Sequence, residues 1–188
     1  MAGETKQSTG SDRRAADEMP LVEIVAEDFN THQKNPISPG FWALAVHRLG
    51  ARVERVDAPL AKKSLDTVHH LLATGVDWMW GIKVPRHTRV GRRVHIWHFG
   101  SLLLNARSIG DDVHIRHDTT FGPLRAHDAN DVSALPVIGS NVEVGSGACV
   151  LGGIAVGDGA RVGANTVVIE PVAAGATVFG VPSRVIAT

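Results

Sequence analysis

Aliphatic residues recur at every sixth position through much of the C-terminal half of the chain. Between 137 and 179 this series consists of Ile138, Val144, Val150, Val156, Val162 and Val168. Four positions after each comes a second, mostly small or β-branched residue: Val142, Ala148, Ile154, Ala160, Thr166 and Val172. A period of six matches neither the 3.6 residues of an α-helical turn nor the two-residue alternation of a flat strand. It is typical of a solenoid of short parallel strands, in which each repeat supplies one side of a coil.

The same period begins further towards the N-terminus, where it shifts once by a single residue. Its members there are Val90, Ile96, Leu102, Ile109, Ile115 and Phe121. The pattern stops after Gly122 and returns at Ile138, and the residues between are largely polar. We therefore expect a parallel β-helix over 81–188, with an excursion loop at 123–136 on one corner. A loop whose base is held by a rigid coil often carries function, although a tolerated insertion would look the same.

Helical patterns precede the coil. Apolar residues of the first helix share one face from Leu21 to Phe29, and a second helix is predicted from Phe41 to about Val56. A third begins after Pro59, with apolar residues at three- and four-residue spacing. These segments predict an α-helical domain over 21–80 that caps the coil and contributes to oligomerisation. We expect the histidines of these helices to be ordinary, partly exposed residues: His47, His69 and His70.

Composition narrows the classes of function. The formal net charge is +0, which favours neither nucleic acid nor an anionic membrane as a partner. Cys149 is the single cysteine, so no intramolecular disulfide forms, and a cytoplasmic location is the simplest expectation. No apolar run approaches the roughly 20 residues of a membrane span. Residues 1–20 are polar without the apolar core of a signal peptide, and we expect them to be disordered.

The geometry of a β-helix suggests how the chain assembles. Its coils expose flat sides along their length, and a triangular prism suits threefold symmetry. We therefore expect a homotrimer, with ligands bound in clefts between subunits.

Several motifs occur in the order known from one enzyme family. They are Gly40-Phe41-Trp42-Ala43, His47-Arg48-Leu49-Gly50, His98-Phe99-Gly100, the looped segment before Pro136, and Gly180-Val181-Pro182-Ser183-Arg184-Val185. Over about 21–186 the chain resembles serine O-acetyltransferases, especially the branch found in exopolysaccharide gene clusters of the colanic-acid type. The resemblance implies a left-handed parallel β-helix that forms trimers or dimers of trimers. It also implies direct acetyl transfer from acetyl-CoA to a hydroxyl, with active sites between adjacent coils.

The resemblance places the general base at His98. An alcohol becomes a good nucleophile when its proton is removed, and imidazole, whose ordinary pKa is about 6.5, is suited to accept it. His98 follows the inward Ile96 by two residues, near a predicted corner. A solvent-exposed corner histidine is the structural alternative. A covalent acyl-enzyme is not expected, because Cys149 has no evident activating partner.

The chain departs from the family at three positions that surround the base or the substrate. Lys83 and Trp97 stand where serine-acetylating members carry acidic residues, and Leu135 stands where they carry a loop histidine. The exopolysaccharide branch also lacks that loop histidine. Residues that could bind the substrate instead are His117, Arg125, His127 and Asp128. The acceptor is left open between serine, a serine-containing intermediate and a sugar, and a catalytically degenerate scaffold is the non-enzymatic alternative.

The resemblance also assigns cofactor contacts. The matching positions for the pantetheine arm are Gly122, Gly145, Ser146, Gly163 and Ala164, and Arg161 and Arg184 could meet the phosphates of CoA. For the glycines and the alanine, a simple requirement of tight turns is the alternative. Cysteine-making members extend into a tail that docks onto a sulfhydrylase. Because the sequence stops at Thr188, we expect no cysteine synthase complex.

A γ-type carbonic anhydrase is the alternative enzyme class, since it is also a hexapeptide trimer. That family has zinc-binding histidines at the positions of Ser146 and Leu151, and neither is present here. The pairs His95/His98 and His114/His117 have an i, i+3 spacing, but on a β-helix such residues point to different places around a corner. We therefore expect no metal site.

Overall fold

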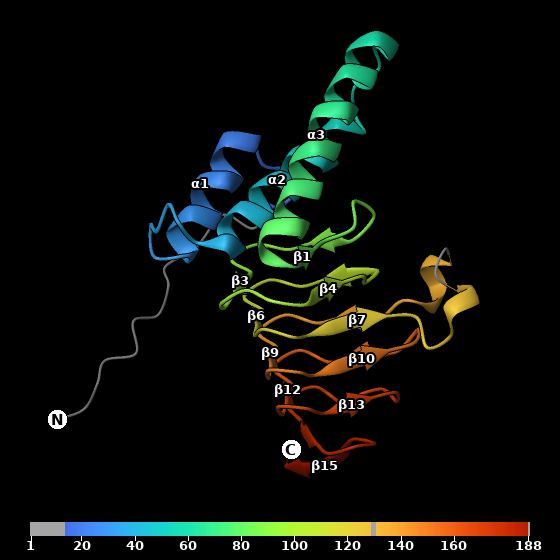
Figure 1. Ribbon diagram of the computed structural model, residues 1–188. Helices are drawn as coiled ribbons and strands as arrows, with labels where there is room; N and C mark the ends of the chain where they lie inside the picture. Colours follow the sequence, from blue (N-terminus) through green and yellow to red (C-terminus); the bar gives the residue numbers. More distant parts are fainter. Residues whose placement is uncertain (1–13, 129–130, 188) are drawn as a thin grey trace, which may run out of the picture.

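The computed structural model describes residues 14–128 and 131–187. Within this part of the chain, three helices stand on one end of a tapering coil of short strands (Figure 1). The helices are α1 (Leu21–Thr31), α2 (Pro39–Val53) and α3 (Pro59–Trp80). None of the helices in the described residues is both long enough and apolar enough to cross a membrane.

Local sequence signals explain where these helices begin and end. The Ser38 hydroxyl accepts a hydrogen bond from Phe41 N at 3.4 Å and caps α2. The helix therefore begins at Pro39, two residues before the predicted start at Phe41. Proline occupies the first position of both α2 and α3, where its missing N–H costs nothing. Helix α3 ends at Gly81, whose φ of 64° is the left-handed conformation that favours glycine.

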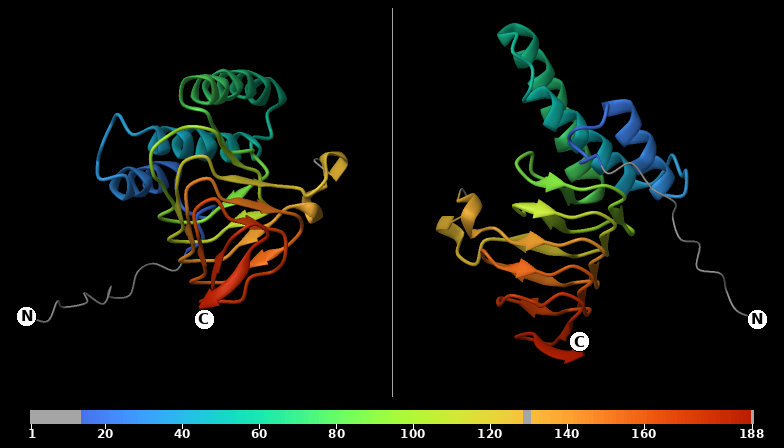
Figure 2. Two further views of the ribbon diagram at one scale, coloured as in Figure 1. Left: turned by 60° about the horizontal axis from the view of Figure 1, so that its bottom comes forward. Right: turned by 180° about the vertical axis from the view of Figure 1, so that it is seen from behind.

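The strands form three parallel sheets, one on each side of the coil (Figure 2). Sheet A contains β1 (Ile82–Lys83), β4 (Leu102–Leu104), β7 (Thr120–Gly122), β10 (Cys149–Leu151) and β13 (Val167–Val168). Sheet B contains β2 (Arg89–Val90), β5 (Ser108–Ile109), β8 (Val137–Ile138) and β11 (Ala155–Val156). Sheet C contains β3 (His95–Ile96), β6 (His114–Ile115), β9 (Glu143–Val144), β12 (Arg161–Val162), β14 (Thr177–Phe179) and the antiparallel β15 (Arg184–Ala187).

The aliphatic series points inward, as its period predicts. All six members between Ile138 and Val168 are buried, and equivalent residues of successive coils pair in register, for example Ile109 with Ile138. Burial of each such side chain contributes roughly 1.5–3 kcal/mol. The stack therefore forms one continuous core along the coil axis.

The single-residue shift in the period has a structural origin that the sequence pattern did not locate. Leu104, and not Leu102, is the residue that pairs with Phe121 in the next coil. Ile96 to Leu104 spans eight positions, whereas Ile115 to Phe121 spans six, so the first corner between sheets C and A is two residues wider. Leu104 to Ile109 then spans five positions, which leaves a net shift of one.

A buried ion pair docks the helical cap on the coil. The Arg48 Nε donates to Asp28 Oδ2 at 3.0 Å, while its terminal nitrogens donate to the carbonyls of Val90 at 2.5 Å and Gly91 at 2.6 Å. Burial raises the pKa of Asp28, and the Arg48 charge opposes that rise. Glycine at position 40 allows the close approach, because a Cβ there would lie 2.6 Å from the Ile96 carbonyl oxygen.

The segment before α1 corrects part of one expectation. Residues 1–20 were expected to be disordered; residues 1–13 lie outside the described residues, but 14–20 pack on the cap. Ala16 and Met19 are buried in a small cluster with Ile24, and the Arg52 guanidinium donates to the Met19 carbonyl. Two apolar side chains in a polar segment are enough for this contact, although they give no periodic signal.

The expectation of partly exposed histidines is wrong for His47 and His69. Both are buried between α2 and α3, whereas His70 is exposed. The His69 ring packs against the backbone of Gly50, where a Cβ would lie 2.3 Å from Nε2. The glycine thus makes room for an imidazole at the helix crossing.

Candidate active site

His98 lies in the widened corner between β3 and β4, and it is exposed. Its φ of 65° is in the left-handed region, as it is for Arg93, Asp112, Asp118, Asn141 and Asn165 at other turns of the coil. The corner is fixed to the end of α3, because Gly100 N donates to Trp80 O at 2.9 Å and Leu102 N donates to Gly81 O at 2.7 Å. The cap thus helps to hold the imidazole in place.

His117 faces His98 from the next coil. Ile96 pairs with Ile115, so the two histidines occupy equivalent positions two residues later, and their ring centroids are 5.8 Å apart at 73°. The Nδ1 of His117 is buried and has no hydrogen-bond partner among the described residues. Asp118 reaches the same corner, since a Cβ at Gly100 would lie 3.4 Å from Asp118 Oδ1. The corner therefore gathers two imidazoles and a carboxylate, groups that can bind and deprotonate a hydroxyl.

Small residues continue this column along the coil. Ser146 and Ala164 follow Val144 and Val162 by two residues, as His117 follows Ile115. The backbone stacks closely here: Gly147 N donates to His117 O at 3.0 Å, and Asn165 N donates to Ser146 O at 2.8 Å. The side of the coil below the histidines therefore presents backbone rather than bulky side chains.

The predicted cofactor glycines fall into two kinds. A Cβ at Gly145 would lie 2.5 Å from Ala164 N, and one at Gly163 would lie 2.4 Å from the Phe179 ring. Coil stacking alone requires these two glycines. At Gly122, by contrast, no atom of the described chain lies within 4 Å of such a Cβ. Gly122 consequently borders open space that a ligand could fill.

The segment between β7 and β8 leaves the coil and carries two short helices, η1 (Ala126–Asp128) and η2 (Val132–Ala134). Arg125 and Asp128 line a pocket of about 280 Å³ at its base, together with Leu151, Gly152 and Ile154 among others. His127 is exposed, and its Nε2 lies 3.3 Å from Asp128 Oδ1. Leu135 is buried and anchors the segment, so the position of the family's loop histidine has a packing role here.

The predicted base and most of the predicted substrate residues lie at two opposite ends of the strands of sheet A. His98 and His117 precede β4 and β7, whereas Arg125, His127 and Asp128 follow β7 in the segment that projects from the coil in Figure 1. The structure brings His98 and His117 together. It does not bring them together with the excursion segment of the same chain.

The predicted phosphate-binding arginines are exposed and lie on sheet C. Arg161 Nε is 4.0 Å from Glu143 Oε1, across neighbouring strands β12 and β9. Arg184 belongs to β15, where it pairs with Phe179. Both side chains are accessible to an anionic ligand.

Trp97 belongs to a cluster of aromatic rings that the sequence did not reveal. Its indole stacks on His95 at 3.9 Å between centroids, and its Nε1 donates to His114 Nδ1 at 3.1 Å. The His32 ring packs edge-on against His95 at 4.7 Å. Burial lowers the pKa of His95 to about 4, and the nearby His32 and His114 add to this effect.

In each of the pairs His95/His98 and His114/His117, the two histidines lie in different parts of the coil. His95 and His114 lie side by side on sheet C with centroids 5.8 Å apart, while His98 and His117 lie at the corner. Across residues 14–128 and 131–187, no group of three or more His, Cys, Asp or Glu side chains could hold a metal ion.

Lys83 is exposed on β1, next to Leu103 of β4. The resemblance implies an acidic residue at this position, whereas the structure shows a lysine side chain there. His117, from the coil below, contacts the His98 ring, and Asp118 borders Gly100 in the same corner.

The chain is a left-handed parallel β-helix with three helices in its N-terminal region, an architecture that it shares with solved serine acetyltransferases. No family model matches the chain. Curated relatives do match it. For example, a serine acetyltransferase of Helicobacter pylori (strain J99) is 33% identical over 149 residues, which cover 79% of this chain and 81% of the relative. One of Mycobacterium tuberculosis is 36% identical over 149 residues, covering 79% of this chain and 61% of the relative. The chain belongs to the serine acetyltransferase family.

Solved structures agree with the fold. A serine acetyltransferase in complex with CoA superimposes with a TM-score of 0.71 at 23% identity, covering 88% of this chain and 69% of the other. The predicted fold class is thereby confirmed. The chain spans about three fifths of the length of the Mycobacterium tuberculosis relative.

Proposed function

We propose that the protein is an O-acetyltransferase that moves an acetyl group from acetyl-CoA directly to a substrate hydroxyl, with His98 as the general base. The observation that carries the proposal is the His98 imidazole itself, exposed in a widened corner and held at a φ of 65° opposite His117. Membership of the serine acetyltransferase family supports the reaction type.

In the proposed reaction, His98 accepts the proton of the hydroxyl while the hydroxyl oxygen attacks the thioester carbonyl carbon. The tetrahedral intermediate carries an oxyanion, which backbone N–H groups at a coil corner would stabilise. Its collapse breaks the carbon–sulfur bond, and protonated His98 returns its proton to the leaving thiolate. The products are the acetyl ester, free CoA and neutral His98.

The acetyl donor lies along the column of small residues in this proposal. Ser146 and Ala164 leave the backbone accessible below His117, and Gly122 borders open space. The exposed Arg161 and Arg184 are available to the phosphates. The CoA complex of a related structure supports the nature of the donor.

We further propose that a homotrimer, or a dimer of trimers, completes the site. His98 lies at the N-terminal ends of the strands of sheet A, and the excursion segment lies at their C-terminal ends. When the A sheets of three subunits surround a threefold axis, the excursion segment of one subunit can therefore meet His98 of the next. The substrate-binding group of this composite site consists of His117, Arg125, His127 and Asp128.

Helix α3 supports self-association of the cap. Its exposed apolar side chains are Leu60, Leu65, Val68, Leu71, Leu72, Trp78 and Met79. A helix face on which seven apolar side chains are exposed is typical of an interface, and a second cap of the same chain offers a matching surface.

Release of free thiol from acetyl-CoA tests the proposal, with L-serine as the first acceptor and a panel of sugars after it. We expect turnover with at least one acceptor. Trp97 stacks on His95 and donates a hydrogen bond to His114, so position 97 offers the acceptor no carboxylate. We therefore expect an acceptor that binds without a carboxylate at this position. If the protein neither binds CoA nor releases thiol with any acceptor, the proposal is wrong, and a catalytically degenerate scaffold is the remaining function.

A further inference from the structure

Strand β3, which leads into the His98 corner, is an edge strand of sheet C. The residues on either side of Ile96 are bound to the next coil, since His95 N and Trp97 N each donate to a carbonyl of that coil at 2.8 Å. Because N–H groups alternate in direction along a strand, Ile96 N points the other way, towards the cap. Ile96 is 2% exposed, so its N–H needs a partner from the protein.

His32, directly after α1, provides this partner. Its Nε2 accepts a hydrogen bond from Ile96 N at 3.3 Å, and its Nδ1 lies 2.8 Å from the carbonyl oxygen of Asp28. A carbonyl oxygen only accepts, so Nδ1 carries a proton, and an Nε2 that accepts carries none. The two contacts therefore fix the neutral ring with its proton on Nδ1. A protonated ring would turn an N–H towards Ile96 N and lose this contact.

The surroundings of His32 keep its ring neutral. The residue is 3% exposed, and burial lowers the pKa of the ring, although the hydrogen bond to the Asp28 carbonyl and the Asp28 charge oppose this effect. The Asp28 carboxylate is already bound to Arg48 Nε at 3.0 Å. From the coil, the His95 ring faces His32 at 4.7 Å between centroids, and it is itself neutral at pH 7 because its pKa is about 4. His32 therefore accepts from Ile96 N at pH 7.

His98 lies between two attachments of the coil to the cap. Ile96, two residues before it, is bound to His32 after α1. Gly100, two residues after it, donates from its N–H to Trp80 O at the end of α3, at 2.9 Å. The loss of either attachment frees one side of the corner. A misplacement of about 1 Å can lower the rate of a reaction about 100-fold.

We propose that His32 is a positioning residue for the transfer reaction, whose neutral ring holds Ile96 at the edge of β3 and thereby holds His98 in its corner. The proposal rests on the proposed role of His98 as the base. Because His32 is buried, it acts through the backbone of β3 and not on the substrate.

Two substitutions of His32 separate its roles as an acceptor and as a filler of space. The amide oxygen of His32→Gln can still accept from Ile96 N, whereas the ring of His32→Phe fills the same space without accepting. We expect His32→Phe to lower kcat for thiol release roughly 10- to 100-fold with the KM for acetyl-CoA unchanged, and His32→Gln to keep kcat within about threefold. A side chain that only filled space would give the opposite order.

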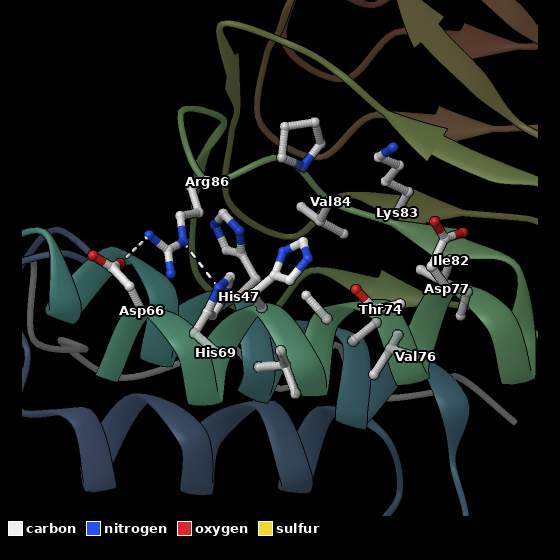
Figure 3. Close-up of a pocket in the computed structure, with 15 residues that line it drawn as sticks. His47, Asp66, His69, Thr74, Val76, Asp77, Ile82, Lys83, Val84 and Arg86 are labelled. Atoms are coloured by element: carbon white, nitrogen blue, oxygen red, sulfur yellow. Dashed lines mark hydrogen bonds and ion pairs between the residues drawn. The ribbon is translucent and has the colours of Figure 1, made fainter. Parts of the chain in front are cut away.

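His69 provides the matched control, since it is another buried imidazole of the cap that accepts a hydrogen bond. Figure 3 shows it in the wall of a cavity of about 530 Å³ between α2, α3 and the segment 82–86, where Arg86 Nε donates to its Nδ1 at 2.9 Å. Its partner does not belong to β3. We expect His69→Phe to lower the free energy of unfolding as His32→Phe does, but to leave kcat unchanged.

Amide hydrogen exchange distinguishes a failure of this proposal from a failure of the proposed function. In His32→Phe the Ile96 amide should exchange roughly tenfold faster than in the parent protein, whereas the Trp97 amide, which donates to the next coil, should keep its protection. An unchanged kcat in His32→Phe, or an unchanged rate of Ile96 exchange, would overturn the positioning role alone. If no acceptor gives turnover, or if His98→Ala is as active as the parent protein, the proposed function fails and the positioning role with it, even when Ile96 exchange changes as expected.

Discussion

At the scale of single residues, similar sequence signals have different physical origins. Gly122 and Gly145 both match cofactor positions of the family, yet their surroundings differ. The backbone of the next coil lies against Gly145, whereas Gly122 faces open space. One glycine is required by the fold, and the other is free to serve a ligand.

Alanine substitutions separate these roles. Gly145→Ala places a Cβ 2.5 Å from Ala164 N, and we expect it to lower the free energy of unfolding by about 1–3 kcal/mol. Gly122→Ala should change that free energy by less than about 0.5 kcal/mol. Urea unfolding measures both. Equal losses in the two variants would contradict the assignment.

The buried imidazole of His95 predicts a pH dependence of stability. Below pH 6.5 a histidine of the unfolded chain binds a proton, whereas burial holds the pKa of His95 at about 4 in the folded protein. The unfolded state therefore binds more protons between pH 6.5 and 4, and stability falls as the pH is lowered through this window. The expected loss from His95 is on the order of 3 kcal/mol.

His95→Phe tests this effect, because phenylalanine keeps a ring beside Trp97 and cannot titrate. Urea unfolding between pH 7 and 4 should give a shallower decline for the variant than for the parent protein. Parallel curves would show that His95 does not contribute.

Residue roles could be predicted only where a motif carried them. The role of His98 as a base was predicted through His98-Phe99-Gly100 and stays a prediction, to which the structure adds the neighbouring ring of His117. The burial of His47 and His69 could not be found, because it depends on how α2 crosses α3 at Gly50. A histidine on a helix has the same local sequence signal whether it is exposed or buried.

At the scale of elements, the contact between cap and coil depends on one guanidinium. Arg48 joins α2 to Asp28 of α1 and to the carbonyls of Val90 and Gly91. We expect Arg48→Met to cost about 3–5 kcal/mol, because it leaves the buried Asp28 carboxylate without its partner.

Arg55→Met is the matched control, since it removes an exposed ion pair with Asp17 and should cost at most about 1 kcal/mol. Hydrogen exchange locates the effect: in Arg48→Met the amides of α1 and α2 should lose protection before those of β9 and β12. Uniform loss along the whole chain would contradict a local role for Arg48.

Most elements of the coil were predictable because each inward aliphatic residue has a fixed spacing. The widened corner was not located, since Leu102 and Leu104 are both aliphatic and both buried, and either satisfies the pattern. Only strand pairing decides between them. The excursion at 123–136 was visible because it interrupts the series completely.

At the scale of the whole molecule, the proposed composite site consists of residues from more than one chain. The exposed apolar side chains of α3 predict that a charge placed among them weakens assembly. We expect Leu71→Glu to lower the particle mass in sedimentation relative to the parent protein, because Leu71 is 66% exposed on that face. His70→Glu is the control, since His70 is exposed on the same helix but lies about 100° around it from Leu71. An unchanged mass in Leu71→Glu would exclude this face from the interface.

The central claim is that His98 is the base of an acetyl transfer. The most direct measurement compares the rate of thiol release from acetyl-CoA in His98→Ala with that in His70→Ala, an exposed histidine of α3. We predict a loss of roughly 10²- to 10⁴-fold for His98→Ala with CoA binding retained, and an unchanged rate for His70→Ala. A His98→Ala protein as active as the parent would contradict the account.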